Sequence, residues 1–475
     1  MIRNACLFTV LVLVAAAIFG LTFAPATGQT TAARPASTTR PVRATRPVPA
    51  TTSAPTLVAT RVLLAEANLP PPPEPTLFVD GANPAASDQN PGTKDKPWKT
   101  LAKAAAAAKA GDVVLVAEGT YDERVSPANS GEKGKLVTFL AKGKAVTRGF
   151  VLKKDYIRVR GFTVFTEQKK GTPYEHGFDC TASGCEMLGN LLDHPNGFGA
   201  NIGGAGNLFR GNTIRYADGI GIVLSGKDNV AEYNDVSHSI KVRAGDADAT
   251  RFFGSGHVIR GNYLHDITHA EAPGAHVDAF QTYDSGGPVQ NILIENNFCY
   301  NLAAQMLMAE GTKLKKSEGI TLRNNVFHTV GAIAINVHGI RNMRVYNNLF
   351  IGGQWVAIRL RDGCTGSQVY NNIVVGIDPV QVDASSKEGT TADYNMTSLA
   401  AGKEPNPLIG PHDIFGKTPA FVDPQKMNFH LKAGSPGAGA GMDLSQQGGF
   451  SADKDGAPRP SGKGWDMGPY QGEGK

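Results

Sequence analysis

Short hydrophobic runs in the middle of the chain are interrupted at regular intervals by asparagine. Between residues 185 and 400, a segment with apolar residues on both sides of an Asn recurs nine times. The repeated residues are Asn190, Asn212, Asn234, Asn262, Asn297, Asn325, Asn348, Asn372 and Asn395. Their spacings are 22, 22, 28, 35, 28, 23, 24 and 23 residues. A unit this short cannot bury a hydrophobic face alone, so the units must stack.

The repeat length selects a fold. Three short strands joined by turns fill such a unit, and parallel stacking places equivalent strands about 4.8 Å apart. The pattern therefore predicts an all-β protein, a parallel β-helix built as a single-stranded solenoid of about 10–12 rungs. We expect the repeated Asn to form a column at one turn, to adopt left-handed backbone angles there and to hydrogen-bond along the column.

The segments around the repeats complete a domain spanning residues 76–472, with its Asn rungs at about 185–400. An Ala-rich stretch predicts a helix over about residues 99–110, suited to cap the open end of the stack. A further segment, residues 415–472, closes the domain as a tail.

The N-terminal region predicts export. Residues 1–28 contain a basic start and an apolar run from Cys6 to Ala24, which is typical of a signal peptide or an N-terminal anchor. Residues 29–75 are rich in Pro, Thr and Ala and predict a disordered linker. We therefore expect a protein that is secreted, or on the cell surface or in the periplasm, with membrane contact only through an uncleaved N-terminal segment.

Composition narrows the partners. The net charge is +5, but only +1 remains for residues 76–475, which gives no basic excess for nucleic acid. The 56 Gly and 29 Pro favour a turn-rich β protein over a helix bundle. Five Cys are too few for a disulfide scaffold, and a bridge between Cys180 and Cys185 is left open. We expect a monomer that binds no nucleotide or organic cofactor.

The segments before and after the Asn repeats resemble segments of known proteins. LFVDGANPAASDQNPGTKDKPWKTLAKAAAAAKAGDVVLVAEGTYDERV resembles the opening of secreted right-handed parallel β-helix proteins of the pectate-lyase-like superfamily. PAFVDPQKMNFHLKAGSPGAGAG is similar to the tail often found in the same proteins. The resemblance implies the right-handed fold, the extracytoplasmic compartment and a polysaccharide partner. For the reaction it implies a choice among uronate lyases, glycoside hydrolases, epimerases and non-catalytic surface proteins.

Three long spacings mark insertions at 241–256, 268–280 and 311–319, which we expect to wall a groove. The strands between them form the floor. Along each of these strands, successive side chains should point alternately into the core and out of it. The residues expected to point inward are Ile333, Ile335, Val337, Ile358 and Leu360. The residues expected to point outward are Glu310, Asn336, His338, Arg359 and Arg361, together with either Asp278 or Gln281.

This floor predicts a lyase acting on an acidic polysaccharide by β-elimination. The carboxylate beside the reacting carbon must be neutralised while a base removes the proton. The base candidates are Lys313, Lys315 and His338, with Glu310 ordering them; the substrate-binding candidates are Gln281, Asn336, Arg359 and Arg361. Asp246, Asp248 and Asp278 offer oxygen ligands that suit Ca²⁺.

Two other functions remain open at this point. Asp278 and Glu310 on adjacent rungs would lie near the ~5 Å separation of a retaining glycosidase pair. The groove is also compatible with a non-catalytic surface module that only binds glycan. Separately, a column of mixed charge can be no more than a solvated ladder of cross-strand pairs.

Overall fold

The computed structural model describes residues 69–472, except residues 167, 169–172, 332 and 401–406. The predicted export segment and most of the predicted linker therefore lie outside the described residues. Within the described residues, no helix has the length and hydrophobicity needed to cross a membrane.

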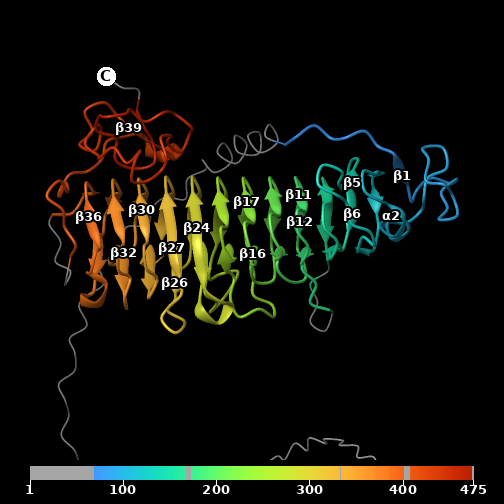
Figure 1. Cartoon of the computed structure of the whole chain (residues 1–475), viewed down its shortest axis with the longest axis horizontal. Helices are drawn as coiled ribbons and strands as arrows, with labels where there is room; N and C mark the ends of the chain where they lie inside the picture. The colour runs from blue at the N-terminus through green and yellow to red at the C-terminus, as the bar shows by residue number, and fades with distance from the viewer. Residues whose placement is uncertain (1–68, 167, 169–172, 332, 401–406, 473–475) are drawn as a thin grey trace, which may run out of the picture. The chain divides into compact units, whose positions relative to one another are not determined.

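Three parallel sheets form the body of the domain (Figure 1), and successive strands along the chain belong to the three sheets in turn. Sheet A has 14 strands: β1 (Leu77–Val79), β2 (Val113–Val116), β5 (Val137–Ala141), β8 (Ile157–Arg160), β11 (Glu186–Leu188), β14 (Leu208–Arg210), β17 (Val230–Glu232), β20 (Gly254–Ser255), β21 (Val258–Arg260), β24 (Val289–Glu295), β27 (Glu318–Arg323), β30 (Arg344–Tyr346), β33 (Gln368–Tyr370) and β36 (Thr391–Asp393).

Sheet B has 12 strands: β3 (Gly119–Thr120), β6 (Ala145–Thr147), β9 (Thr163–Phe165), β12 (Leu191–Asp193), β15 (Thr213–Arg215), β18 (Asp235–Ser237), β22 (Tyr263–Ile267), β25 (Phe298–Leu302), β28 (Val326–Val330), β31 (Leu349–Ile351), β34 (Ile373–Val375) and β37 (Met396–Thr397). Sheet C has 11 strands: β4 (Arg124–Val125), β7 (Gly149–Leu152), β10 (Phe178–Cys180), β13 (Ala200–Ile202), β16 (Ile222–Leu224), β19 (Thr250–Phe252), β23 (Phe280–Thr282), β26 (Leu307–Glu310), β29 (Ile335–His338), β32 (Val356–Arg361) and β35 (Asp378–Val382). The predicted parallel β-helix is confirmed.

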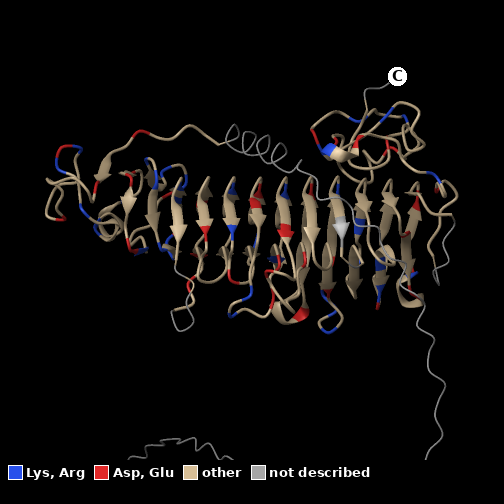
Figure 2. Cartoon of the chain, turned by 180° about the vertical axis from the view of Figure 1, so that it is seen from behind, with Lys and Arg blue, Asp and Glu red and all other residues tan. Residues whose placement is uncertain are grey.

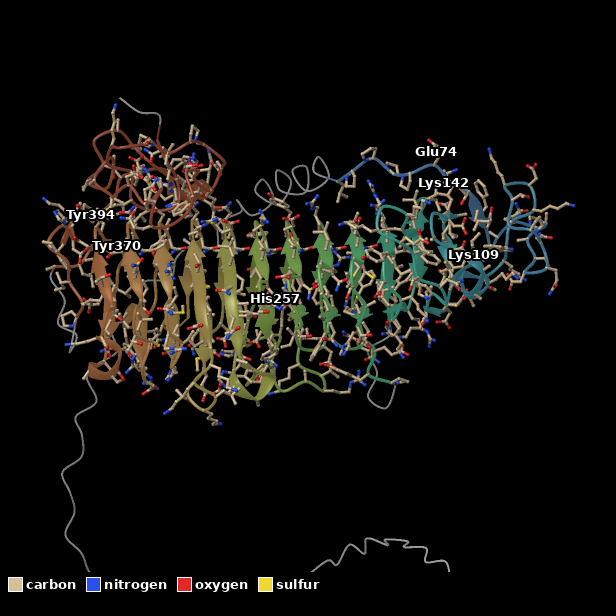
Figure 3. The ribbon with its side chains drawn as sticks, viewed as in Figure 1. Glu74, Lys109, Lys142, His257, Tyr370 and Tyr394 are labelled. Carbon is tan, nitrogen blue, oxygen red and sulfur yellow. The ribbon has the colours of Figure 1, made fainter. Side chains whose placement is uncertain are left out.

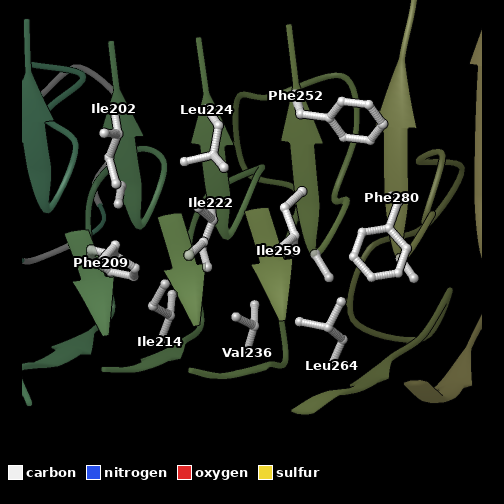
Figure 4. Packing of buried hydrophobic residues seen from close by; sticks show 14 of the residues in the cluster. Ile202, Phe209, Ile214, Ile222, Leu224, Val236, Phe252, Ile259, Leu264 and Phe280 are labelled. Atoms are coloured by element: carbon white, nitrogen blue, oxygen red, sulfur yellow. The ribbon is translucent and has the colours of Figure 1, made fainter. Parts of the chain in front are cut away.

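Side chains from all three sheets meet in one core (Figure 4), with Ile202 and Leu224 of sheet C facing Phe209 of sheet A and Ile214 of sheet B. In β10 and β13 of sheet C the first and third residues are buried and the second is half-buried, as expected for a pleated strand, whereas β16, β19 and β23 bury all three residues. The prediction that Ile335 and Val337 point inward is confirmed. Ile333 precedes the strand and does not belong to the core cluster, which contains Ala334 in its place.

The repeated Asn form the predicted column. The side-chain amide of each donates to the side-chain oxygen of the next at 2.9 to 3.1 Å. The backbone N–H of each donates to the same oxygen, also at 2.9 to 3.1 Å. Every amide in this column is buried, so the column replaces water as hydrogen-bonding partner at each rung.

One expectation about these Asn was wrong. The left-handed backbone angle belongs to the residue before each ladder Asn, because that residue makes the turn while the ladder Asn points inward. The left-handed residues are Gly189, Gly211, Tyr233, Gly261, Asn296, Asn324, Asn347, Asn371 and Tyr394.

A second, shorter column lies at the turn between sheets C and A. The oxygen of Asn207 accepts from the backbone N–H of Cys185, and that of Asn229 accepts from Asn207, at 2.8 and 2.9 Å. His257, marked in Figure 3, continues the column by accepting from the N–H of Asn229 at 3.1 Å. Burial lowers the pKa of His257, which favours the neutral ring that this role requires. His257 is therefore a structural residue.

The predicted N-terminal helix exists but is shorter than expected. Helix α2 (Leu101–Ala107) begins after Thr100, whose hydroxyl accepts from the N–H of Lys103 at 3.1 Å. It ends because Ala108 is extended, and the carbonyl of Ala108 accepts from the side chain of Asn129 at 3.0 Å. The helix packs beside β4, the first strand of sheet C, and its function as a cap stays a prediction.

The C-terminal segment folds back on the rungs. It contains the hairpin β38 (Phe421–Asp423) and β39 (Asn428–Leu431). The described residues also include the 3₁₀ turns η1 (Asp284–Gly286), η2 (Ala384–Ser386) and η3 (Pro424–Lys426). The side chain of Asn347 donates to the carbonyls of Asp466 and Gly468, both at 3.1 Å.

Cys180 and Cys185 are both buried free thiols in this structure.

Candidate functional site

The outward residues of sheet C form a continuous column. The pairing register places the following side chains next to one another on successive strands: Asp179, Asn201, Val223, Arg251, Gln281, Met308, Asn336, Arg359 and Gln381. Three of these, Arg251, Gln281 and Asn336, keep a buried polar atom without a partner: Nε, Oε1 and Oδ1 respectively. The column therefore offers hydrogen-bonding groups that the described residues leave unused.

A second column lies at the carboxyl ends of three neighbouring strands. Glu310 is paired with His338, and His338 with Arg361, so these residues share one level of sheet C as alternation predicted. Nδ1 of His338 lies 2.8 Å from a carboxylate oxygen of Asp362. Nε of Arg361 donates to the His338 ring, 2.9 Å from Nδ1 and 3.1 Å from Nε2. Among the described residues, neither terminal nitrogen of Arg361 has a hydrogen-bond partner, and its side chain is 37% exposed.

Residues that follow the strands of sheet C line a cavity of about 530 Å³, called here the basic cavity. Its charged lining residues are Lys315, Lys316, Arg341 and Glu318, and its other walls are mainly Gly and Ser from the turns after β16, β19 and β23. The loop that follows β26 shows blue in Figure 2, and its basic residues are Lys313, Lys315 and Lys316. Glu318 pairs with Arg341 at 3.0 Å, whereas no ion pair of Lys315 or Lys316 occurs in the described part of the chain. The cavity therefore has an excess of positive charge.

Lys313 is placed differently from the other two lysines of its loop. Its backbone N–H donates to the carboxylate of Asp284 at 2.5 Å, and its side chain does not line the basic cavity. Glu310 accepts a hydrogen bond from the hydroxyl of Thr312 at 3.3 Å. Of the predicted base candidates, the structure thus brings Lys315 and His338 to the same end of sheet C.

The three predicted calcium ligands lie close together around Arg251. Its guanidinium donates to Asp246 at 2.7 Å and to Asp248 at 2.5 Å. Asp278 is fully buried, and its carboxylate accepts from the backbone N–H of Gln305 at 2.9 Å and from Gln281 at 3.1 Å. The carboxylates already have a cation and N–H donors, so the described arrangement does not fit a Ca²⁺ ion. Within the described residues, no group of three or more His, Cys, Asp or Glu has metal-binding geometry.

Burial has the largest effect on the pKa values of Asp248 and Asp278. It raises the pKa of Asp248, and the nearby Asp278 raises it further while Arg251 opposes the shift. Burial likewise raises the pKa of Asp278, against the hydrogen bonds from Gln305 and Gln281. Asp248 also accepts from the backbone N–H of Asp278 at 3.0 Å, so both carboxyl groups bond to the next rung as turn residues do.

The pairing register of β23 with β26 places Asp278 and Glu310 too far apart for the predicted glycosidase pair. Phe280 is level with Leu307, which places Asp278 level with Gln305 and Glu310 five residues farther along the strand direction. At about 3.3 Å per residue the two carboxyl groups are roughly 16 Å apart, beyond the separations that glycosidase pairs use. Asp278 also does not join the outward column, where Gln281 takes the place that had been left open between them.

The structure also contains a pocket that the sequence did not indicate, called here the aromatic pocket. It has a volume of about 390 Å³ and opens at the amino ends of β10 to β19. It is lined by Tyr174, Phe198, Ile220, Arg243, Ala244, Gly245, Asp246 and Arg251. Phe198 and Ile220 both stand two residues before their strands, as Asp248 and Asp278 do, so aligning the rungs by their strands would have brought these residues together.

Family models and solved structures both agree with this fold. Residues 241–395 match a family described as "Right handed beta helix region", and residues 85–133 match one described as "Protein of unknown function (DUF1565)". The protein folds as a right-handed parallel β-helix. The crystal structure of pectate lyase Pel9A is similar, with 17% identity and a TM-score of 0.50, over 83% of this chain and 96% of that chain. The complex of XylC with xylose is similar at 12% identity and a TM-score of 0.51, over 83% and 98%.

Among curated proteins, "Uncharacterized protein YwoF" of Bacillus subtilis (strain 168) is 51% identical over 57 residues. The match spans 12% of each chain, so it concerns one segment and not the whole solenoid. The structural similarity, at identities below 25%, supports the predicted fold alone. It leaves the reaction to be argued from this chain's own residues.

Proposed function

We propose that the protein is an extracytoplasmic polysaccharide lyase that cleaves an acidic, uronate-containing polysaccharide by β-elimination. In this reaction a base removes the proton on the carbon next to the carboxylate. The electron pair forms a carbon–carbon double bond as the glycosidic oxygen leaves and takes up a proton. A cation must meanwhile bind the carboxylate, because negative charge accumulates there before the bond breaks.

The observation that carries the proposal is the state of Arg361. Its Nε is fixed on the His338 ring, whereas its two terminal nitrogens have no partner in the described structure. A guanidinium held by one nitrogen and open at the other two can bind a carboxylate with two parallel hydrogen bonds. The pectate lyase named above has the same fold, which adds to the case without assigning residues.

Lys315 is the base in this proposal, and His338 positions Arg361. Both ring nitrogens of His338 lie within hydrogen-bonding distance of Arg361 or Asp362, which makes the ring a support for the guanidinium. Lys315 lines the basic cavity and has no acidic partner among the described residues, so its amine is available to a substrate.

A panel of acidic and neutral polysaccharides tests the proposal. Lyase products carry a conjugated double bond that absorbs ultraviolet light, and each is lighter by one water than the hydrolysis product. We expect release of such products from an acidic polymer, a loss of about 10²–10⁴ in turnover for Lys315→Ala, and a loss of about tenfold or more for Arg361→Lys. The matched controls are Lys142→Ala, whose residue is exposed and marked in Figure 3, and Arg215→Lys on sheet B.

Other results would redirect the assignment. Loss of activity in Lys313→Ala with full activity in Lys315→Ala would move the base to Lys313. Binding of acidic polymers without any product, equal in wild type and in Lys315→Ala, would make the protein a non-catalytic glycan-binding module.

A further inference from the structure

We propose that the aromatic pocket binds an uncharged pyranose unit of the substrate, so that the natural substrate is a polysaccharide containing both acidic and neutral sugars. This inference rests on the proposed function for the acidic unit only. Binding of a neutral sugar in the aromatic pocket can be measured whether or not the protein is a lyase.

One wall of the aromatic pocket is apolar and rigid. Tyr174 is 40% exposed, yet its hydroxyl donates to the carbonyl of Asp218 at 2.8 Å and the guanidinium of Arg243 lies 4.7 Å from its ring centre. Phe198 stacks on the ring of His176 with centroids 4.6 Å apart. Ring faces fixed in this way offer the apolar surface against which the C–H face of a sugar packs, at little cost in conformational entropy.

The opposite wall carries an acceptor and a donor side by side. Asp246 is about one-third exposed and uses one carboxylate oxygen for Arg251, at 2.7 Å. The Nε of Arg251 is buried and has no acceptor in the described structure, while the other guanidinium nitrogens bind Asp246, Asp248 and Tyr283. An unpartnered donor next to an exposed carboxylate matches two neighbouring hydroxyl groups of a sugar.

Charge selects a neutral sugar over an acidic one. Arg243 pairs with the buried carboxylate of Asp218 at 3.3 Å, and Arg251 is shared by Asp246 and Asp248. The described residues of this pocket thus contain no positive charge beyond what these carboxylates balance. A uronate placed here would face Asp246 without a compensating cation, whereas the basic cavity provides one.

The two sites are joined by the outward column of sheet C. Arg251 on β19 is level with Asn336 on β29, three strands away and about 14 Å at ~4.8 Å per strand, and His338 lies two residues farther along β29. Gln281 and Asn336, which lie between or beside them, keep buried acceptor oxygens without a partner. A sugar chain that runs along this column would pass Gln281 and Asn336 between the aromatic pocket and Arg361.

Calorimetric titration with neutral oligosaccharides, and with uronate oligosaccharides of the same length, tests the inference. The variants are Phe198→Ala, Asp246→Asn and Ala244→Leu, which respectively remove the stacking ring, remove the carboxylate charge and narrow the pocket. Each should weaken the binding of a neutral oligosaccharide by about tenfold or more, because each removes a contact with the sugar or the space that it occupies. Lys316→Ala in the basic cavity is the control and should weaken uronate binding alone.

Three results would overturn the inference: no neutral sugar binds at millimolar concentration, neutral binding is unchanged in both Asp246→Asn and Ala244→Leu, or uronates bind this pocket more tightly than neutral sugars. Failure of the lyase assay together with loss of neutral binding in these variants would sink the proposed reaction and leave the neutral-sugar site standing.

Discussion

Replacing Asn262 by Ala removes the centre of the asparagine column and should be strongly destabilising. Asn262 is fully buried, and its amide donates to the oxygen of Asn297 at 3.0 Å and to the carbonyl of Ala231 at 2.9 Å. Its own oxygen accepts from the backbone N–H and the side chain of Asn234 at 2.9 and 3.0 Å.

The magnitude follows from the groups left unpaired. In Asn262→Ala, the N–H of Asn234 and the carbonyl of Ala231 lose their partners in the dry interior, and each such loss costs about 1–3 kcal/mol. The missing amide also leaves a void that the stacked rungs cannot close. We therefore expect the free energy of unfolding to fall by about 4 kcal/mol. Asn262→Asp, which keeps the acceptor oxygen and loses the donors, should fall between this variant and wild type.

Chemical denaturation of the purified protein, followed by circular dichroism, measures the loss. The control is Asn201→Ala, which removes an outward asparagine with one side-chain hydrogen bond, to Asp179 at 3.2 Å. The control should change the free energy of unfolding by no more than about 1 kcal/mol. Equal effects of Asn262→Ala and Asn201→Ala would refute the view that the buried column holds the rungs together.

Three further predictions concern pH, metal and the C-terminal segment. Burial lowers the pKa of His265, but its hydrogen bonds to Asp235 and Asp266 outweigh burial and raise it to about 9. The resulting stabilisation, about 3 kcal/mol, should be complete below pH 6.5 and disappear as pH rises through 9; unfolding measured against pH should show this loss in wild type and not in His265→Gln. Because Arg251 already pairs with Asp246 and Asp248, and Asp278 accepts from Gln281 and Gln305, exhaustive chelation should leave the melting temperature unchanged, and a fall that calcium alone restores would contradict this. Asn347→Gly keeps the left-handed turn but removes both hydrogen bonds to the C-terminal segment, so limited proteolysis should cut that segment faster while the solenoid stays intact; unchanged cleavage would show that other contacts suffice to hold it.

The fold was predictable because its strongest constraint is periodic. The ladder Asn recur at a spacing that only a stacked solenoid satisfies, and alternation within β29 and β32 then placed His338 and Arg361 on one outward column. The exact register was not predictable around β23, because the run VDAFQT mixes a turn residue, Asp278, with a strand residue, Gln281. The helix bound failed for a related reason, since tertiary contacts at Ala108 end a run whose helix propensity continues.

The misassigned backbone angles show what a single sequence pattern hides. Each repeat contains two adjacent positions, and a pair such as Asn347 and Asn348 looks redundant. The structure separates them: Asn348 points into the column, whereas Asn347 takes the left-handed turn and faces the C-terminal segment. The turn position is Gly in three of the first four repeats, from Asn190 to Asn262, and Asn in the next four, from Asn297 to Asn372.

That difference has a physical cause. A left-handed turn accepts Gly or Asn at similar cost, so the backbone alone does not choose between them. Asn is found where a side chain is needed: Asn324, Asn347 and Asn371 donate to the carbonyls of Ala452, Asp466 and Met442 in the C-terminal segment. The turn residue of each repeat therefore indicates which rungs contact the C-terminal segment, just as the ladder Asn indicates that the rungs stack. By the same logic, residues that break the repeat without serving its turns or its core, such as Phe198, Asp246 and Arg361, are the first to suspect of contacting a ligand.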